Sequence, residues 1–180
     1  FLASPCPQHG GPALAFAQRN RLNVEKEYQV KVAYIFQFCV QFAWPSNAFA
    51  NNQSPLVIGV YGNAPIGAKL NILAIKKKAQ GRRILVKRIG PKDDPTQAQV
   101  LFVSSTTSPA ARAALVRLTQ NHPILLVGEN RGFAEQGAAM NFFITPNATV
   151  GYEINIEACV RRHLNDGPVV RKNGRVVRDR

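Results

Sequence analysis

The stretch "GNAPIGAKL", residues 62–70, follows an apolar run and has the outline of a phosphate-binding loop. Such a loop needs lysine directly after its second glycine, then a hydroxyl residue that holds magnesium. Gly62 and Gly67 have the required spacing, but the lysine comes one position late, at Lys69, and Leu70 replaces the hydroxyl residue. One position on a helix turns a side chain by about 100°. We therefore interpret the stretch as a tight strand-to-helix turn with Gly62 at positive φ, and not as a nucleotide site.

Nucleophiles and metal ligands are sparse and scattered along the chain. The three histidines lie far apart, and the Gly-x-Ser-x-Gly elbow of serine hydrolases is missing. The three cysteines, Cys6, Cys39 and Cys159, are too few and too scattered for a disulfide scaffold or a zinc site. Cys39 falls on the apolar face of a predicted helix, where a buried free thiol is expected. We predict a protein that is not an enzyme and that holds no metal or other cofactor.

The charge of the chain is strongly positive, because 23 Lys and Arg against 10 Asp and Glu give a net charge of +13. The cations cluster in "KKKAQGRR", residues 76–83, and in residues 161–180. This balance favours an anionic partner: nucleic acid, a membrane surface or an acidic protein. Neither cluster has the interleaved aromatic residues that assist nucleic-acid binding, so we expect no nucleic acid. The alternative hypothesis is a basic α/β module whose affinity for nucleic acid or other anionic ligands falls steeply with salt.

Residues 1–22 are predicted to lie outside the folded domain, as a signal remnant or a disordered segment. The piece "PALAFAQ" ends in Ala15-Phe16-Ala17 before Gln18, which is the A-x-A pattern of a signal cleavage site. Taken alone, the pattern leaves an export signal and a disordered tail open as alternatives. No run approaches the roughly 18 to 20 apolar residues of a membrane span, so no transmembrane segment is expected.

Hydrophobic periodicity predicts alternating helices and strands through residues 23–164. Asn23 is expected to cap the first helix, and Ser108 to cap a later helix that Pro109 opens. Leu118 is expected on the packed face of that later helix. The predicted helices cover residues 23–42, 65–74, 108–121 and 157–163; the predicted strands cover residues 55–61, 82–90, 99–105 and 122–129, with a hairpin over residues 140–156.

This order of elements predicts an α/β fold: a three-layer sandwich with a mixed, mostly parallel sheet that ends in a β-hairpin. The length of 180 residues suits one domain with one sizeable core, and we assign that domain to residues 23–164. Residues 165–180 contain Gly167-Pro168 and Gly174. We expect this basic tail to be disordered and to form no regular helix.

Several segments together resemble the YfiR family, whose members are periplasmic repressors of a membrane-bound diguanylate cyclase. The matching pieces are "VKVAYIFQFCVQFAWP", "LVIGVYGNAPIGAKL", "QVLFVSS", "PILLVGENRGFAEQGAAMNFFI" and "VGYEINIEA", in the family's order, over roughly residues 28 to 160. The resemblance implies an exported, non-enzymatic and usually homodimeric regulator, which favours cleavage after Ala17. It also implies that the repressor binds the periplasmic sensor domain of the cyclase, so that cyclic di-GMP and biofilm formation stay low.

The family's partner surface, carried over by motif, lies on the hairpin and the helix after it. It points here to Phe142, Glu153 and Cys159. Phe142 stands in an alternating strand, where a phenylalanine is typical of the core. Glu153 stands within an apolar run, and a carboxylate there needs a partner, either inside the chain or on another chain. We predict that Glu153→Ala weakens partner binding without loss of the fold.

Two features depart from the family. Some members carry paired cysteines that respond to redox state, whereas the three cysteines here are far apart in sequence, so control by a disulfide is not expected. Members usually continue with an amphipathic C-terminal helix, which residues 165–180 are not expected to form. A partner surface built from that last helix therefore cannot be carried over to this chain.

Overall fold

The structure, a computed structural model, describes residues 12–180, with side chains described from residue 23 onward. Residues 1–11 of the predicted N-terminal segment, and with them Cys6, lie outside the described residues. The helices are α1 (Pro12–Gln41), α2 (Ile66–Lys76), α3 (Pro109–Thr119), α4 (Ile156–Arg161) and α5 (Pro168–Asn173), with 3-10 turns η1 (Ser46–Ala48) and η2 (Pro95–Gln97). The strands are β1 (Leu56–Tyr61), β2 (Lys78–Ala79), β3 (Arg82–Ile89), β4 (Val100–Val103), β5 (Leu125–Gly128), β6 (Met140–Ile144), β7 (Val150–Asn155) and β8 (Arg175–Val177).

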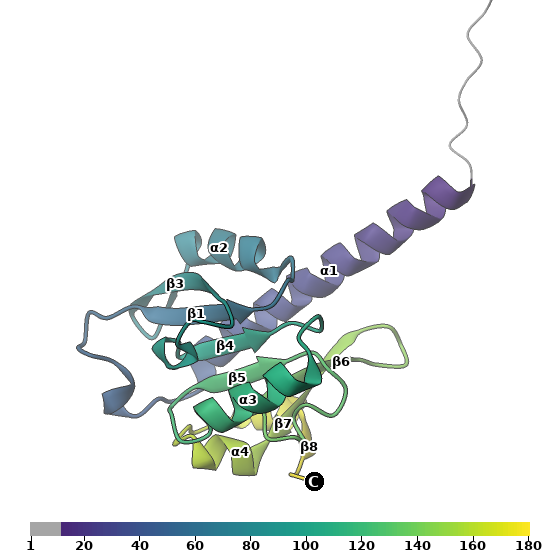
Figure 1. The fold of residues 1–180 in the computed structure, drawn as a ribbon. Helices are drawn as coiled ribbons and strands as arrows, with labels where there is room; N and C mark the ends of the chain where they lie inside the picture. Colours follow the sequence, from purple (N-terminus) through teal and green to yellow (C-terminus); the bar gives the residue numbers. More distant parts are fainter. Residues whose placement is uncertain (1–11) are drawn as a thin grey trace, which may run out of the picture.

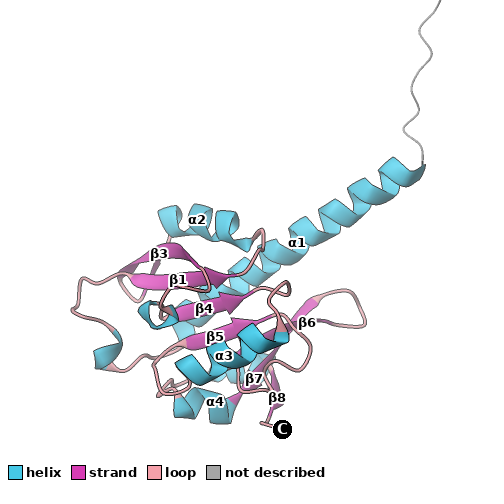
Figure 2. Ribbon diagram, viewed as in Figure 1, coloured by secondary structure: helices cyan, strands magenta, loops and turns pink. Residues whose placement is uncertain are grey.

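One sheet of eight strands, in the order β2-β3-β1-β4-β5-β6-β7-β8, forms the middle layer. Strands β3, β1, β4, β5 and β6 run parallel, while β2 and β7 are antiparallel to β3 and β6, and β8 is parallel to β7. Figure 1 shows α1 and α3 on opposite faces of this sheet, and Figure 2 shows how the helices sandwich the strands. The predicted α/β sandwich, with its mixed, mostly parallel sheet and its β6–β7 hairpin, is confirmed.

Helix α1 packs one apolar face on the sheet and extends well beyond it (Figure 1). Ile35 and Phe42 on this face are almost fully buried, as their helical spacing predicts, and Phe38 is buried beside them. The predicted start at Asn23 is wrong, because the helix already begins at Pro12. Residues 13–22 contain no glycine or proline, so nothing local interrupts the helix before Asn23. Within residues 12–180, no helix is both long and apolar enough to cross a membrane.

Two apolar cores fill the space on either side of the sheet. The larger core joins α1 and α2 to the sheet, and the smaller core joins α3 to β4 and β5. In α3, the Ser108 hydroxyl accepts a hydrogen bond from the Ala111 N–H at 3.2 Å, so the predicted cap is confirmed. The prediction for Leu118 is wrong: this side chain is exposed, whereas Leu115 and Thr119 face the sheet. These two are one helical turn apart, and Leu118 lies beside their stripe.

The prediction that the tail, residues 165–180, forms no regular helix and is disordered is wrong, because the tail contains α5 and β8. Pro168 opens α5 at a position where its missing N–H costs nothing, and Gly174 follows the helix end. Val170 is fully buried, and its carbonyl accepts a hydrogen bond from the Tyr152 hydroxyl at 2.9 Å. The glycines and the proline therefore mark the ends of a short docked helix, after which β8 adds to β7.

Candidate partner-binding surface

A row of polar side chains crosses the last three strands of the sheet. Asn141 on β6 lies opposite Glu153 on β7, and Glu153 lies opposite Arg175 on β8. Successive side chains of a strand point to opposite faces, so the row faces away from α1. The neighbouring pair, Phe142 and Tyr152, instead packs in the core against α1.

Glu153 is satisfied inside the chain. Its side chain is 7% exposed, and its Oε1 accepts a hydrogen bond from Arg175, whose side chain is 59% exposed. Its Oε2 accepts a hydrogen bond from the Asn141 Nδ2 at 3.1 Å. The Arg175 guanidinium also lies over the Phe143 ring, 4.3 Å from its centroid. The buried carboxylate therefore has an internal counter-charge, and that counter-charge stands at the surface where another molecule can reach it.

A second buried carboxylate, Glu129, directly follows the end of β5. Its Oε2 accepts from the Lys31 Nζ at 2.6 Å, and its Oε1 accepts from the Tyr28 hydroxyl at 3.1 Å and from the Ser105 N–H at 2.8 Å. The Lys31 and Glu129 side chains are only 5% and 3% exposed. Burial, and then the charge of Glu129, raise the pKa of Tyr28. This network ties α1 to the ends of the parallel strands, beside the polar row.

A groove of about 470 Å³ runs between the two carboxylates. We call it the Glu153 groove and define it by Glu129, Arg131, Phe143, Glu153 and Arg175. It continues into a hollow of about 770 Å³ that Arg131, Glu153 and Arg175 also line. Arg131 is exposed and makes no ion pair with any residue that the structure describes. The groove therefore offers a free cation beside two carboxylates that are already paired.

The sequence-derived site residues do not all reach this groove. Glu153 lines it, and Phe142 contributes to its wall, but the Phe142 ring stacks on Phe38 in the core, with centroids 6.0 Å apart. Cys159 is buried in α4 and lines neither part of the groove. Only Glu153 among the three thus stands where a partner could come close to its polar atoms.

The structure explains the glycine-rich turn at the start of α2. Gly62 has φ +85°, as predicted, and a Cβ there would lie 2.8 Å from the Thr107 Oγ1. Side chains from the β4–α3 loop fill the turn: the Ser104 hydroxyl donates to the Asn63 carbonyl at 3.0 Å. Lys69 points to the other side and pairs with Glu25 of α1. The turn packs against its neighbouring loop and does not direct Lys69 into a phosphate cradle.

The chemistry of the two described thiols is that of core residues. Cys39 and Cys159 are buried and free, as predicted for Cys39. Burial raises the pKa of each thiol to about 12, so the nucleophilic thiolate is scarce at neutral pH. Among residues 12–180, no three His, Cys, Asp or Glu side chains are grouped so that they could hold a metal ion.

The family model described as YfiR/HmsC-like matches residues 28–170. The chain belongs to this family. The match begins in α1 and ends within α5, so it includes the parallel strands, the β6–β7 hairpin and most of the Glu153 groove. Arg175 and the rest of β8 lie beyond the match. No curated protein matches the sequence. Membership of the YfiR/HmsC-like family indicates a regulator in cyclic di-GMP signalling.

Sequence reasoning missed four residues of the site: Lys31, Glu129, Arg131 and Arg175. Lys31 lies four residues after Glu27, which is the spacing of a helical ion pair, and the two side chains do pair. Glu129 directly follows an apolar strand, which places a charge at the edge where ligands of parallel sheets usually bind. No local pattern marked Arg175, because its contact with Glu153 depends on β8.

Proposed function

We propose that this chain is an exported repressor that binds the periplasmic sensor domain of a membrane-bound diguanylate cyclase and keeps the cyclase inactive. The observation that carries the proposal is the family match over residues 28–170, which spans the domain from α1 to α5. While the repressor is bound, cyclic di-GMP stays low and biofilm formation is restrained. Release of the repressor lets cyclic di-GMP rise.

The Glu153 groove is the surface that we assign to the sensor domain. Glu153 is held in place by Asn141 and Arg175, so little ordering is needed when a partner arrives. Arg131 is exposed and free to meet a carboxylate of the partner. In this proposal Phe142 and Cys159 act from the core, where they fix the positions of β6, β7 and α4.

A regulatory role fits the chemistry of the described residues better than catalysis does. The buried carboxylates Glu129 and Glu153 are both paired with cations, which is the arrangement of structural ion pairs. The raised pKa of Cys39 and of Cys159 makes both thiols poor nucleophiles. We also propose a homodimer, as the family resemblance implies, and its mass in solution tests this.

An affinity capture tests the proposal. The purified chain is immobilised, detergent-solubilised membranes are passed over it at low and at moderate salt, and the retained proteins are identified. We expect a diguanylate cyclase with an extracytoplasmic sensor domain to stay bound at moderate salt. Arg131→Ala should reduce its retention, whereas Lys92→Ala, which removes an exposed lysine from a turn outside the groove, should not.

If only nucleic acid or bulk acidic protein binds, and salt removes it, the net charge of +13 explains the binding. The chain would then be the basic α/β module of the alternative hypothesis, and the repressor assignment would fall.

A further inference from the structure

The edge of the sheet opposite the Glu153 groove is left open. Strand β2 pairs with β3 only through Lys78 with Arg83 and Ala79 with Arg82. From Ile84 to Ile89, β3 pairs with β1 on one side, and no described strand pairs with its other side. An open strand edge presents unpaired N–H and C=O groups, which are a template for another strand.

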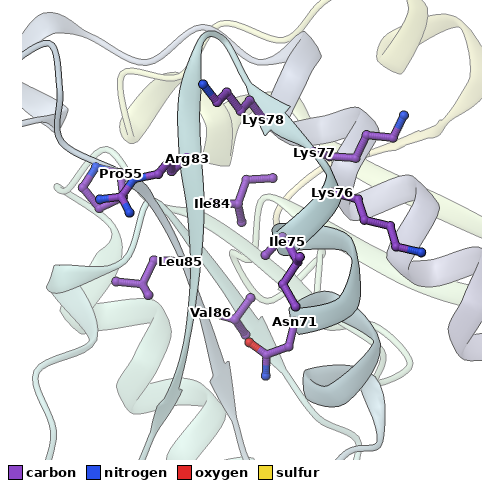
Figure 3. A pocket seen from close by; sticks show the side chains of 11 residues that line it. Pro55, Asn71, Ile75, Lys76, Lys77, Lys78, Arg83, Ile84, Leu85 and Val86 are labelled. Carbon is purple, nitrogen blue, oxygen red and sulfur yellow. The ribbon is translucent and has the colours of Figure 1, made fainter.

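A groove of about 660 Å³ lies along this open edge, between β3 and the C-terminal end of α2 (Figure 3). We call it the lysine groove. Figure 3 shows Ile84 and Val86 pointing from β3 toward Ile75 and Asn71 of α2, while Leu85 points to the other side of the strand. Ile75 is 85% exposed, which is unusual for a large apolar side chain. The groove therefore joins an open backbone edge to one large apolar side chain, Ile75, that is almost fully exposed.

Four cations surround the lysine groove: Lys76, Lys77, Lys78 and Arg83. None of the four makes an ion pair with a residue that the structure describes, and the groove lining contains no carboxylate. Charged residues often protect a strand edge from unwanted pairing. Lys76 and Lys77, however, stand on the end of α2 and beyond it, not on the strand, so edge protection does not explain them.

We infer that the lysine groove binds an extended, acidic segment of another protein, which adds to the edge of β3 as an extra strand. In such an addition the backbone supplies the pairing and alternate side chains supply the specificity. Apolar side chains of the segment cover Ile75 and Val86, and its carboxylates meet the lysines. A second copy of this chain is disfavoured as the partner at this edge, because pairing of the two β3 edges would place the four groove cations of one copy against the same four cations of the other. An anionic membrane would match the charge but cannot donate hydrogen bonds to the strand carbonyls.

This inference goes beyond the proposed function, because the lysine groove and the Glu153 groove lie at opposite ends of the strand order. A chain with both surfaces can hold the cyclase at one edge of the sheet and a second protein at the other. The proposal for the Glu153 groove and the inference for the lysine groove can fail independently, because each is tested with its own variants and its own probe.

The test uses the intact purified chain and a short fluorescent peptide of alternating glutamate and valine, followed by anisotropy. A second peptide has the same sequence and charge, with every other backbone amide N-methylated, so that it cannot complete a strand ladder. We expect the first peptide to bind and the methylated peptide to bind at least about tenfold more weakly. Lys77→Glu should weaken binding about fivefold or more, whereas Lys172→Glu makes the same charge change on α5, outside the lysine groove, and should not.

Three results would overturn the inference. Equal binding of the two peptides would show that charge alone acts. Equal effects of Lys77→Glu and Lys172→Glu would place the binding outside the lysine groove. Absence of peptide binding, with retention on vesicles that contain phosphatidylglycerol, would identify the lysines as a membrane-surface patch. Thermal melting of each variant shows whether it is folded. If the Lys77→Glu variant is not folded, Lys78→Glu serves as a second probe of the lysine groove.

Discussion

Replacing Lys31 with methionine removes one partner of the most deeply buried ion pair in the described structure. Glu129, 3% exposed, would keep only the Tyr28 hydroxyl and the Ser105 N–H as donors. A buried charge that loses its counter-charge typically costs 3–5 kcal/mol. Because two hydrogen bonds to Glu129 remain, we expect Lys31→Met to lower the free energy of unfolding by roughly 3 kcal/mol.

The structure supplies a matched control on α2, the helix that packs beside α1. Lys69→Met also removes one partner of an ion pair with α1, but Glu25, the other partner, is 52% exposed. That variant should lose less than about 1 kcal/mol. The double variant Lys31→Met with Glu129→Gln removes both buried charges, so its loss should be smaller than the sum of the two single losses by at least about 1 kcal/mol.

Urea unfolding gives these free energies, with fluorescence of Trp44, the only tryptophan, as the probe. Trp44 lies just beyond the end of α1 and next to Phe42, with ring centroids 6.3 Å apart, so its emission should report release of the helix. If Lys31→Met lost no more stability than Lys69→Met, or if the double variant lost the full sum, the buried ion pair would not be an anchor of α1.

Three further predictions follow from the turn, the thiols and the polar row. Gly62→Ala should lower the melting temperature by several degrees, because it forces alanine to positive φ with its Cβ against Thr107; an unchanged melting temperature would contradict this. Between pH 9 and 12 the unfolded state releases the protons of Cys39 and Cys159 while the folded state keeps them, since burial raises the pKa of both to about 12. The two buried thiols therefore make their full contribution to the free energy of unfolding below about pH 9. Above this pH, each thiol should lower the free energy of unfolding by roughly 1.4 kcal/mol for every pH unit, which urea titrations across this range would show. A free energy that does not change with pH would refute the burial of the thiols. Glu153→Gln should weaken binding of the sensor domain about tenfold in calorimetry, with little change in melting temperature, and equal affinity would remove Glu153 from the partner surface.

Local patterns were sufficient to predict the central elements of the fold. Hydrophobic periodicity predicts the first helix up to Phe42, and the Ser108-Pro109 pair predicts the start of α3. These signals act within a few residues, so they can be interpreted without knowledge of the fold. The same locality explains the wrong prediction for the tail: Gly167 and Gly174 are typical helix breakers, but here they flank a short helix that is stabilised by burial of Val170.

The candidate site depends on contacts between distant residues, and these were only partly predictable. The need of Glu153 for a partner follows from its apolar surroundings. The identity of the partner, Arg175, requires that β8 pair with β7 in one register, which no local pattern shows. Lys31 and Glu129 are 98 residues apart, and they meet only because α1 crosses the ends of the parallel strands.

The most direct test of the repressor proposal is the level of cyclic di-GMP in cells of the source organism that lack this chain. We predict a higher level than in the parent cells. Restoring the exported chain should bring the level down, whereas the same chain carrying Arg131→Ala and Glu153→Gln should not. A level that does not change when the chain is removed, under conditions where the parent cells make it, would contradict the proposal that the chain represses a diguanylate cyclase.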